Sequence, residues 1–311
     1  MQVDELVRGV LGGDRRAVAR AISAVEDGGV GLEELSEGIF AETGRAATIG
    51  LTGAPGVGKS TLAAGVVRVS RARDLRVAVL AVDPTSPYTG GALLGDRVRM
   101  QEHATDPSVF IRSMATRGHL GGMALAAPEA VRILDAAGYA RIVVETVGVG
   151  QAEVDVAAAT DTAVVVLAPG MGDAVQMAKA GILEVADVFV VNKADRDGAH
   201  EVVRELRQML HLGAARDWDP PVLTTAATDD EGVEAVWEAI ESHRTHLEAT
   251  GALGAKRRAR LLREVEALAA ERFRLRVTSV LEADDDLAND LVERRVDPYE
   301  AAAMLVTRAA G

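Results

Sequence analysis

One short stretch constrains the fold of this chain more than any other. The apolar, β-branched segment 47–52 leads into the glycine-rich segment 53–61, and apolar residues at helical spacing follow at once. Glycine reaches backbone conformations closed to other residues, so successive N–H groups of such a loop can turn inward on an anion at a helix N-terminus. The pattern predicts a strand, a phosphate-binding loop and a helix, and the predicted loop residues are Gly53, Ala54, Pro55, Gly56, Val57, Gly58, Lys59, Ser60 and Thr61.

Two side chains at the end of this loop carry its chemistry. Lys59 would place a point charge on the β- and γ-phosphates of a nucleotide, and the Ser60 hydroxyl is placed to coordinate Mg²⁺. The alternative is a glycine-rich turn with an incidental Lys-Ser pair, but the apolar run before the motif and the helical pattern after it favour the phosphate loop. We therefore predict that the chain binds a nucleoside triphosphate.

From residue 47 onward, apolar strand-like runs alternate with helical patterns. This alternation predicts an α/β fold, a P-loop NTPase whose mostly parallel sheet is flanked by helices on both faces. In such sheets ligands bind beyond the carboxyl ends of the strands, so residues at those ends are the candidates for function. The predicted strands are 47–52, 76–82, 109–112, 140–145, 162–168, 187–191 and 221–225, and the clearest later helix is 231–243.

Helical segments precede and follow the predicted sheet. Before it, Asp14 is placed to cap a helix that ends at Gly28. After it, a basic cluster within 256–263 is predicted to form a solvated helix face, and Asp297 gives a capping-box-like start to the last helix. The predicted parts are an N-terminal helical extension (1–45), a nucleotide-binding domain (46–247) and a C-terminal helical segment (248–311).

Acidic residues follow two of the predicted strands. Asp83 follows 76–82, and a role in binding Mg²⁺ beside the phosphate loop is favoured over a turn-forming role before proline. Asp96 lies in a glycine-rich segment of the kind that the γ-phosphate and its metal order. Glu145 ends 140–145, and Gly148 follows three residues later, which resembles the Asp-x-x-Gly of GTPases. The predicted metal ligands are Ser60, Asp83, Asp96 and Glu145, and the predicted catalytic residues are Lys59, Asp96, Glu145 and Gly148.

The tetrapeptide Asn192-Lys193-Ala194-Asp195 directly follows the predicted strand 187–191. The Asp195 carboxylate can accept hydrogen bonds from guanine N1–H and from the 2-amino group, whereas adenine offers neither donor. A buried acceptor left unpaired by the wrong base gives strong selectivity. We therefore predict GTP rather than ATP as the nucleotide, held by Asn192, Lys193 and Asp195, with a backbone N–H from Thr225 or Ala226 on guanine O6.

Composition excludes several classes of function. The net charge of −13 and an aromatic content of 3% disfavour nucleic-acid binding. The chain has no cysteine, so thiolate metal sites and disulfides are excluded. His243 and His246 are interpreted as surface helix residues rather than half of a metal site. The start of the chain lacks the pattern of a secretion signal, and no apolar run reaches membrane-spanning length, so we expect a cytoplasmic protein that does not bind membranes.

Taken together, the motifs closely resemble those of the MeaB/ArgK family of P-loop GTPases. The resemblance is dense over residues 45–245, and its most specific string is Glu-Thr-Val-Gly-Val-Gly-Gln at 145–151. The other matching segments are 53–61, 82–86, 89–100, 110–113, 119–122, 170–173 and 192–195.

The resemblance implies a homodimeric GTPase that serves an adenosylcobalamin-dependent methylmalonyl-CoA mutase by gating cofactor loading and by protecting or reactivating the enzyme. It implies that the C-terminal helices form the dimer arm. It also implies a partner switch within 170–181, with Gly170, Asp173, Gln176 and Lys179 as its residues. Family members often carry an acid where this chain has Ala174, which is a departure within that switch.

Other functions share parts of these motifs. A P-loop kinase for a small molecule would lack guanine selectivity, and a metal-insertion GTPase for nickel enzymes would normally carry Cys/His clusters, which this chain lacks. A GTP-responsive adaptor for another client enzyme is a third alternative. No water-orienting glutamine stands out, so intrinsic turnover is expected to be slow, and Arg117 is a candidate for positive charge supplied in cis.

Overall fold

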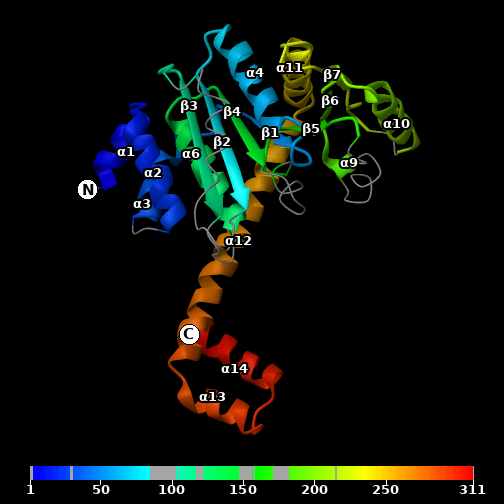
Figure 1. Ribbon diagram of the computed structural model, residues 1–311. Helices are drawn as coiled ribbons and strands as arrows, with labels where there is room; N and C mark the ends of the chain where they lie inside the picture. Colours follow the sequence, from blue (N-terminus) through cyan, green and yellow to red (C-terminus); the bar gives the residue numbers. More distant parts are fainter. Residues whose placement is uncertain are drawn as a thin grey trace. The chain divides into compact units, whose positions relative to one another are not determined.

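The computed structural model describes residues 3–28, 31–84, 103, 105–116, 122–146, 156, 158–170, 182–213 and 216–310 (Figure 1). Its contacts divide the chain into two compact units, Met1–Arg260 and Leu261–Gly311. No helix in the described residues is long and apolar enough to cross a membrane.

A seven-stranded sheet forms the centre of the first unit, in the order β3-β2-β4-β1-β5-β6-β7 with every neighbouring pair parallel. This confirms the predicted α/β fold. β1 has the predicted bounds, whereas β2 and β3 pair further than predicted, to Pro84 and Thr116. The strands are β1 (Ala47–Thr52), β2 (Val77–Pro84), β3 (Val109–Thr116), β4 (Arg141–Thr146), β5 (Thr162–Leu167), β6 (Val188–Asn192) and β7 (Val222–Thr225).

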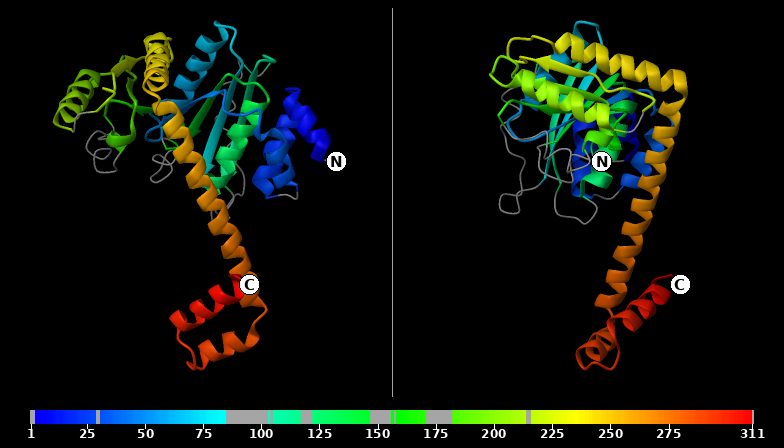
Figure 2. Two further views of the ribbon diagram at one scale, coloured as in Figure 1. Left: turned by 180° about the vertical axis from the view of Figure 1, so that it is seen from behind. Right: turned by 90° about the vertical axis from the view of Figure 1, so that its right-hand side faces the viewer.

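Helices cover both faces of the sheet (Figures 1 and 2). On one face, α4 (Lys59–Arg71) and α11 (Val233–Thr250) bury one set of alternate strand residues, including Ile49 and Leu51. On the other face, the N-terminal helices and α6 (Gly122–Ala136) bury Leu80 and Val144. Because both faces are covered, the inner strands read as continuous apolar runs rather than as alternating ones. Two further helices, α9 (Ile182–Val185) and α10 (Ala199–Leu212), flank β6 along the chain.

The N-terminal helices form as the sequence predicts. The Asp14 carboxylate accepts a hydrogen bond of 2.7 Å from the Ala17 N–H and so caps the second helix. Gly28, at φ 62°, ends that helix in the left-handed region. Arg112 of β3 donates to the Ala19 carbonyl at 2.8 Å, which ties the second helix to the sheet. The three helices are α1 (Val3–Leu11), α2 (Arg15–Asp27) and α3 (Leu32–Phe40).

The start of α12 (Ala252–Glu282) corrects the prediction of a wholly solvated basic face. Arg257 lies 2.6 Å from the carboxylate of Asp161, which is 2% exposed at the start of β5. Lys256 donates to the Asp161 carbonyl at 2.7 Å, and Arg260 lies 3.4 Å from the same carboxylate. These cations pair with a buried acid that stands about a hundred residues away in the sequence, so helical periodicity alone could not predict the contact.

The interpretation of His243 as a surface residue is wrong. Its side chain is 2% exposed, its Nε2 lies 3.3 Å from the Asp187 carboxylate, and its Nδ1 lies 2.9 Å from Thr162 Oγ1. Burial lowers the pKa of His243, and the opposing effect of Asp187 is smaller. The residue is therefore a buried, hydrogen-bonded part of the interior. Among the residues that the structure describes, no group of three or more potential metal-binding side chains occurs.

The second unit contains the rest of α12 together with α13 (Asp285–Val292) and α14 (Pro298–Ala310). Its small core is centred on Leu287, Ala301 and Leu305. The Asp297 carboxylate accepts hydrogen bonds from the N–H groups of residues 299 and 300, at 2.7 and 3.2 Å, which confirms the predicted start of the last helix.

Candidate functional site

The glycine-rich loop between β1 and α4 has backbone conformations that only glycine adopts easily. Gly53 has φ 139°, and Gly58 has φ 99°. A Cβ atom at Gly53 would lie 2.1 Å from the Val166 carbonyl oxygen, and one at Gly58 would lie 2.2 Å from Asn192 Nδ2. Both glycines are therefore required by close approach as well as by backbone conformation.

Lys59 begins α4 and points back into the curve of the loop. Its side chain is buried, and Nζ donates to the carbonyls of Gly53 and Ala54 at 2.6 and 3.0 Å. Gly58 precedes the helix and has no side chain to cap it. The ammonium group and the start of α4 therefore make this end of the helix favourable for an anion.

Ser60 and Glu145 meet beside the loop. β4 lies next to β1, and Leu51 pairs in register with Glu145. The Ser60 hydroxyl donates to Glu145 Oε1 at 2.6 Å, and Glu145 is 2% exposed. A hydroxyl and a carboxylate oxygen beside a phosphate-binding loop are ligands that Mg²⁺ accepts, so these residues fit the predicted metal.

Of the other two acids predicted to bind the metal, the structure describes only Asp83. Asp83 lies within β2 rather than beyond its end, because the pairing with β3 continues through Asp83 and Ala115. Asp96 and Gly148 lie outside the described residues. Their roles stay predictions.

Asn192 joins the loop to the ends of two strands. Its Nδ2 donates to the Val57 carbonyl at 2.8 Å. Its Oδ1 accepts from the Thr225 hydroxyl at 2.9 Å and from the Ala227 N–H at 3.2 Å. Asn192 and Thr225 are both buried, so these hydrogen bonds lie in the interior of the protein. The predicted base-recognition motif is thus connected directly to the phosphate loop.

The rest of the motif lies at the end of β6. Lys193 has φ 57°, and its ammonium group hydrogen-bonds the Gly56 carbonyl, so its aliphatic chain passes along the loop. Asp195 is exposed, and the Ala194 N–H donates to the Thr225 carbonyl at 3.0 Å. The exposed carboxylate is accessible to a ligand that Lys193 and the loop would flank.

The segment after β7 makes hydrogen bonds within the protein. Thr225 acts on Asn192 through its hydroxyl, and the Ala226 N–H donates to the Glu231 carbonyl at 3.1 Å. The predicted contact from the Thr225 or Ala226 N–H to guanine O6 stays a prediction. Ala227 was not among the predicted residues, and its adjacency to Ala226 is the only sequence signal that could have pointed to it.

The predicted partner switch lies almost entirely outside the described residues. Gly170 is described and exposed, at φ 84°, and, its chain neighbours apart, no heavy atom of the described residues lies within 4 Å of the position that a Cβ would take. The other switch residues, Asp173, Gln176 and Lys179, lie outside the described part, as does Arg117.

A parallel sheet with a glycine-rich loop after its central strand, a lysine inside that loop and an Asn-Lys-x-Asp motif at the end of β6, two strands along, defines a P-loop GTPase. The family model described as "Methylmalonyl Co-A mutase-associated GTPase MeaB" matches residues 18–282. The chain belongs to this family.

Individual relatives agree with this assignment. A provisionally named GTPase of Pyrococcus horikoshii is 47% identical over 99% of each chain. GTPase ArgK of Escherichia coli is 39% identical over 80% of this chain and 78% of its own. The mitochondrial methylmalonic aciduria type A homolog of Mus musculus is 36% identical over 82% of this chain and 66% of its own.

A solved structure resembles this chain over nearly its whole length. A crystal structure titled as an LAO/AO transport system kinase has a TM-score of 0.73 and 28% identity, and the match covers 99% of this chain and 98% of the other. The shared fold extends over the helical segments as well as over the sheet.

Proposed function

We propose that this protein hydrolyses GTP to GDP and phosphate with Mg²⁺ at the loop 53–61, and that it acts as a chaperone for an adenosylcobalamin-dependent methylmalonyl-CoA mutase. In the first role, a water oxygen bonds to the γ-phosphorus while the bond from that phosphorus to the β–γ bridging oxygen breaks. Catalysis comes mainly from positioning and from charge neutralisation.

The protein's own groups have distinct parts in this reaction. Lys59 and the N–H groups of the loop would hold the phosphates, and Asn192, Lys193 and Asp195 would hold guanine. Ser60 and Glu145, with the predicted acids Asp83 and Asp96, would hold Mg²⁺, which when bound neutralises charge on the phosphate oxygens. The observation that supports this proposal most directly is the hydrogen bond from Asn192 to the Val57 carbonyl, because it links the predicted guanine-binding motif to the phosphate loop.

The chaperone role is supported by the family to which the chain belongs. The family is described as mutase-associated, and the mouse relative is named for methylmalonic aciduria. We propose that segment 170–181 contacts the mutase, with Gly170, Asp173, Gln176 and Lys179 as the contacting residues. GTP binding and hydrolysis would then control when the cofactor is loaded and when an inactive mutase is repaired.

We further propose that the chain works as a homodimer through its C-terminal helices. In this proposal, residues 1–45 are a helical extension, 46–247 bind the nucleotide, and 248–311 form the dimer arm. The exposed apolar side chains of the second unit support it, because exposed apolar surface of this kind commonly marks an interface.

The test measures GTP and ATP hydrolysis with Mg²⁺, alone and with the methylmalonyl-CoA mutase of the same cell. Guanine-selective turnover that rises when the mutase is added would support both parts of the proposal. GTP turnover that the mutase leaves unchanged, together with no co-sedimentation in the GTP state, would contradict the chaperone role and leave the GTPase intact. Absence of GTP turnover in both conditions would contradict the catalytic role.

A further inference from the structure

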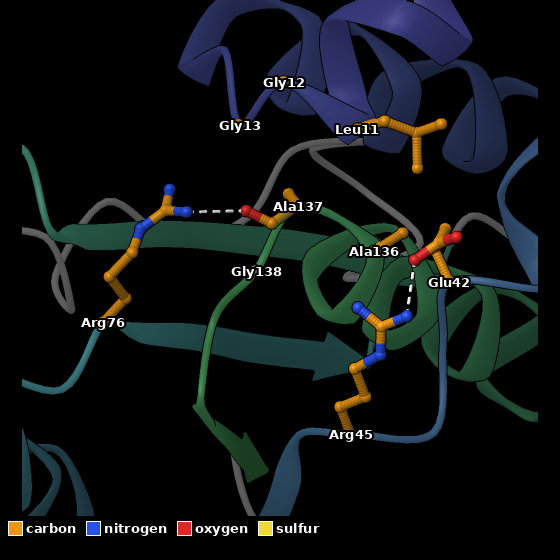
Figure 3. A pocket seen from close by; sticks show the side chains of 9 residues that line it. All are labelled: Leu11, Gly12, Gly13, Glu42, Arg45, Arg76, Ala136, Ala137 and Gly138. Carbon is orange, nitrogen blue, oxygen red and sulfur yellow. Dashed lines mark hydrogen bonds and ion pairs between the residues drawn. The ribbon is translucent and has the colours of Figure 1, made fainter.

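A cavity lies at the end of the sheet opposite the phosphate loop. It measures about 380 Å³ and is lined by the turn between α1 and α2, by Arg76 just before β2, and by the turn at Gly138 before β4 (Figure 3). The strands are parallel, so the segments before β2 and β4 lie together at the amino-terminal ends of the strands. The phosphate loop instead follows the carboxyl end of β1. The cavity is therefore separate from the nucleotide site. Its volume is in the range of small-ligand sites.

Arg76 supplies a fixed positive charge to this cavity. Its Nη1 donates to the Ala137 carbonyl at 2.7 Å, and its guanidinium carbon lies 4.5 Å from the centre of the Tyr139 ring. Tyr139 is buried, so the guanidinium rests on a rigid support. No ion pair to Arg76 occurs among the residues that the structure describes. A half-buried guanidinium without a carboxylate partner has donors available for an oxyanion.

Two turns that contain glycine pack closely against this guanidinium. Gly13 has φ 71° and Gly138 has φ 83°. A Cβ atom at either position would lie 3.2 or 3.1 Å from Arg76 Nη1, which is tighter than ordinary packing allows. Both turns therefore approach the guanidinium closely because they carry no side chain there.

Arg45 and Glu42 lie across the cavity from Arg76 (Figure 3). They form an ion pair whose side chains are 71% and 48% exposed. Exposed pairs of this kind contribute little to stability, so Arg45 can turn toward a bound anion at small cost. Leu11, which is 40% exposed, provides an apolar surface on the same cavity.

We propose that this cavity binds a small organic anion, with its carboxylate or phosphate group on Arg76 and its carbon skeleton against Leu11. The planar fork of arginine suits both kinds of oxyanion, and Arg45 adds a second positive charge when it turns from Glu42 toward the ligand. The cavity has room for a carbon skeleton beside the charged group. The chain as a whole has a net charge of −13, so a cavity with two arginines in its lining differs from the acidic character of the molecule.

The test uses the full chain with GDP and Mg²⁺ in excess, and the Lys59→Ala variant as a second background in which the phosphate loop is impaired. Succinate binding is followed by saturation-transfer NMR, and inorganic phosphate binding by ³¹P line broadening, at constant ionic strength. Saturable binding of either probe in both backgrounds is expected, and the probe that binds identifies the preferred oxyanion. Absence of saturable binding of both probes would overturn the proposal.

Matched variants locate the site. Leu11→Glu places a carboxylate at the rim and should weaken binding at least about tenfold, whereas Leu11→Gln should stay within about threefold. Arg76→Gln should remove binding, and its melting curve reports whether the variant is folded. Equal affinity in the two Leu11 variants would overturn the proposal even if Arg76→Gln failed to fold, because Leu11 is an exposed residue.

Discussion

At the residue scale, Asn192 is the side chain on which the nucleotide site depends most. Asn192→Ala would leave the buried Val57 carbonyl and Thr225 hydroxyl without their present partner. We expect the free energy of unfolding to fall by about 2 kcal/mol or more, and GDP affinity to fall at least about tenfold because the loop loses its tie. Urea unfolding and titration with a fluorescent GDP analogue measure the two effects.

The matched control for this prediction is Asn289→Ala. Asn289 is exposed on α13, so both quantities should remain unchanged within error. GDP affinity in Asn192→Ala equal to that of the unaltered protein would contradict the role given to Asn192.

A second residue-scale prediction concerns the choice of base. Asp195→Asn replaces a carboxylate that accepts two N–H groups by an amide that offers one acceptor and a donor. GTP affinity should therefore fall at least about tenfold, while xanthosine triphosphate, whose 2-oxo group can accept from the amide, should gain affinity. Competition binding measures both. Asp197→Asn, an exposed change two residues away, is the control, and equal GTP losses in the two variants would contradict a guanine contact at Asp195.

The sequence predicts individual residues best where a motif fixes them. The contact between Ser60 and Glu145 agrees with the predicted metal site, because strand order places the end of β4 beside the loop. The bond from Asn192 to Val57 was not predicted, since a carbonyl acceptor leaves no signal in residue type. His243 was misjudged because its partners, Asp187 and Thr162, come from strand starts far away in the sequence.

At the scale of elements, Asp161 links the starts of β1, β5 and α12. Its N–H donates to Thr48 Oγ1 at 2.8 Å, and its carboxylate receives Arg257 and Arg260. Burial alone would raise the pKa of Asp161, but the hydrogen bond from Arg257 and the charges of both arginines outweigh it, so the pKa is lowered. The start of α12 is thus held to the strands that lead to the phosphate loop and to segment 170–181.

This lowered pKa predicts a dependence of stability on pH. In the folded protein the Asp161 carboxyl stays ionised below its usual pKa of 3.8, where the unfolded chain binds the proton. Its contribution to the free energy of unfolding is therefore complete above about pH 5 and is lost as the pH falls through 3.8 and below. Asp161→Asn should lower the free energy of unfolding at pH 7 by about 3 kcal/mol. It should also make the free energy of unfolding depend less on pH in this range.

Urea denaturation between pH 7 and pH 3 measures the profile. Asp217→Asn, an exposed change, should retain the profile of the unaltered protein. An Asp161→Asn profile parallel to that of the unaltered protein across this range would contradict the ionised, paired state of Asp161.

Predicted and observed strand bounds differ by at most one residue for every strand except β2 and β3. β1, β5 and β6 lie inside the sheet and read as apolar runs whose bounds the sequence gives to within one residue. β3, at the edge of the sheet, extends to Thr116, because backbone pairing with β2 does not require an apolar side chain at each position. Backbone pairing can therefore extend a strand into a segment whose side chains do not follow the apolar pattern of a strand.

At the scale of the whole molecule, the second unit raises the question of assembly. A unit of this size with a core centred on three side chains buries little apolar surface by itself. Its segment of α12 exposes Leu262 and Val265, at 57% and 62%. Association through such side chains would remove them from water, which favours the proposed dimer over an isolated unit.

The prediction is that the chain sediments at twice its mass of 32.6 kDa at micromolar concentration and that Leu262→Asp or Val265→Asp shifts it to the monomer. A carboxylate placed in an apolar contact is costly to desolvate, so either change should weaken dimerisation at least about a hundredfold. Leu212→Asp on α10 is the control. Leu212 is 79% exposed, more than either residue of α12, so exposure alone would predict the larger effect there. A dimer that survives both changes in α12 but not the change at Leu212 would move the interface to the first unit.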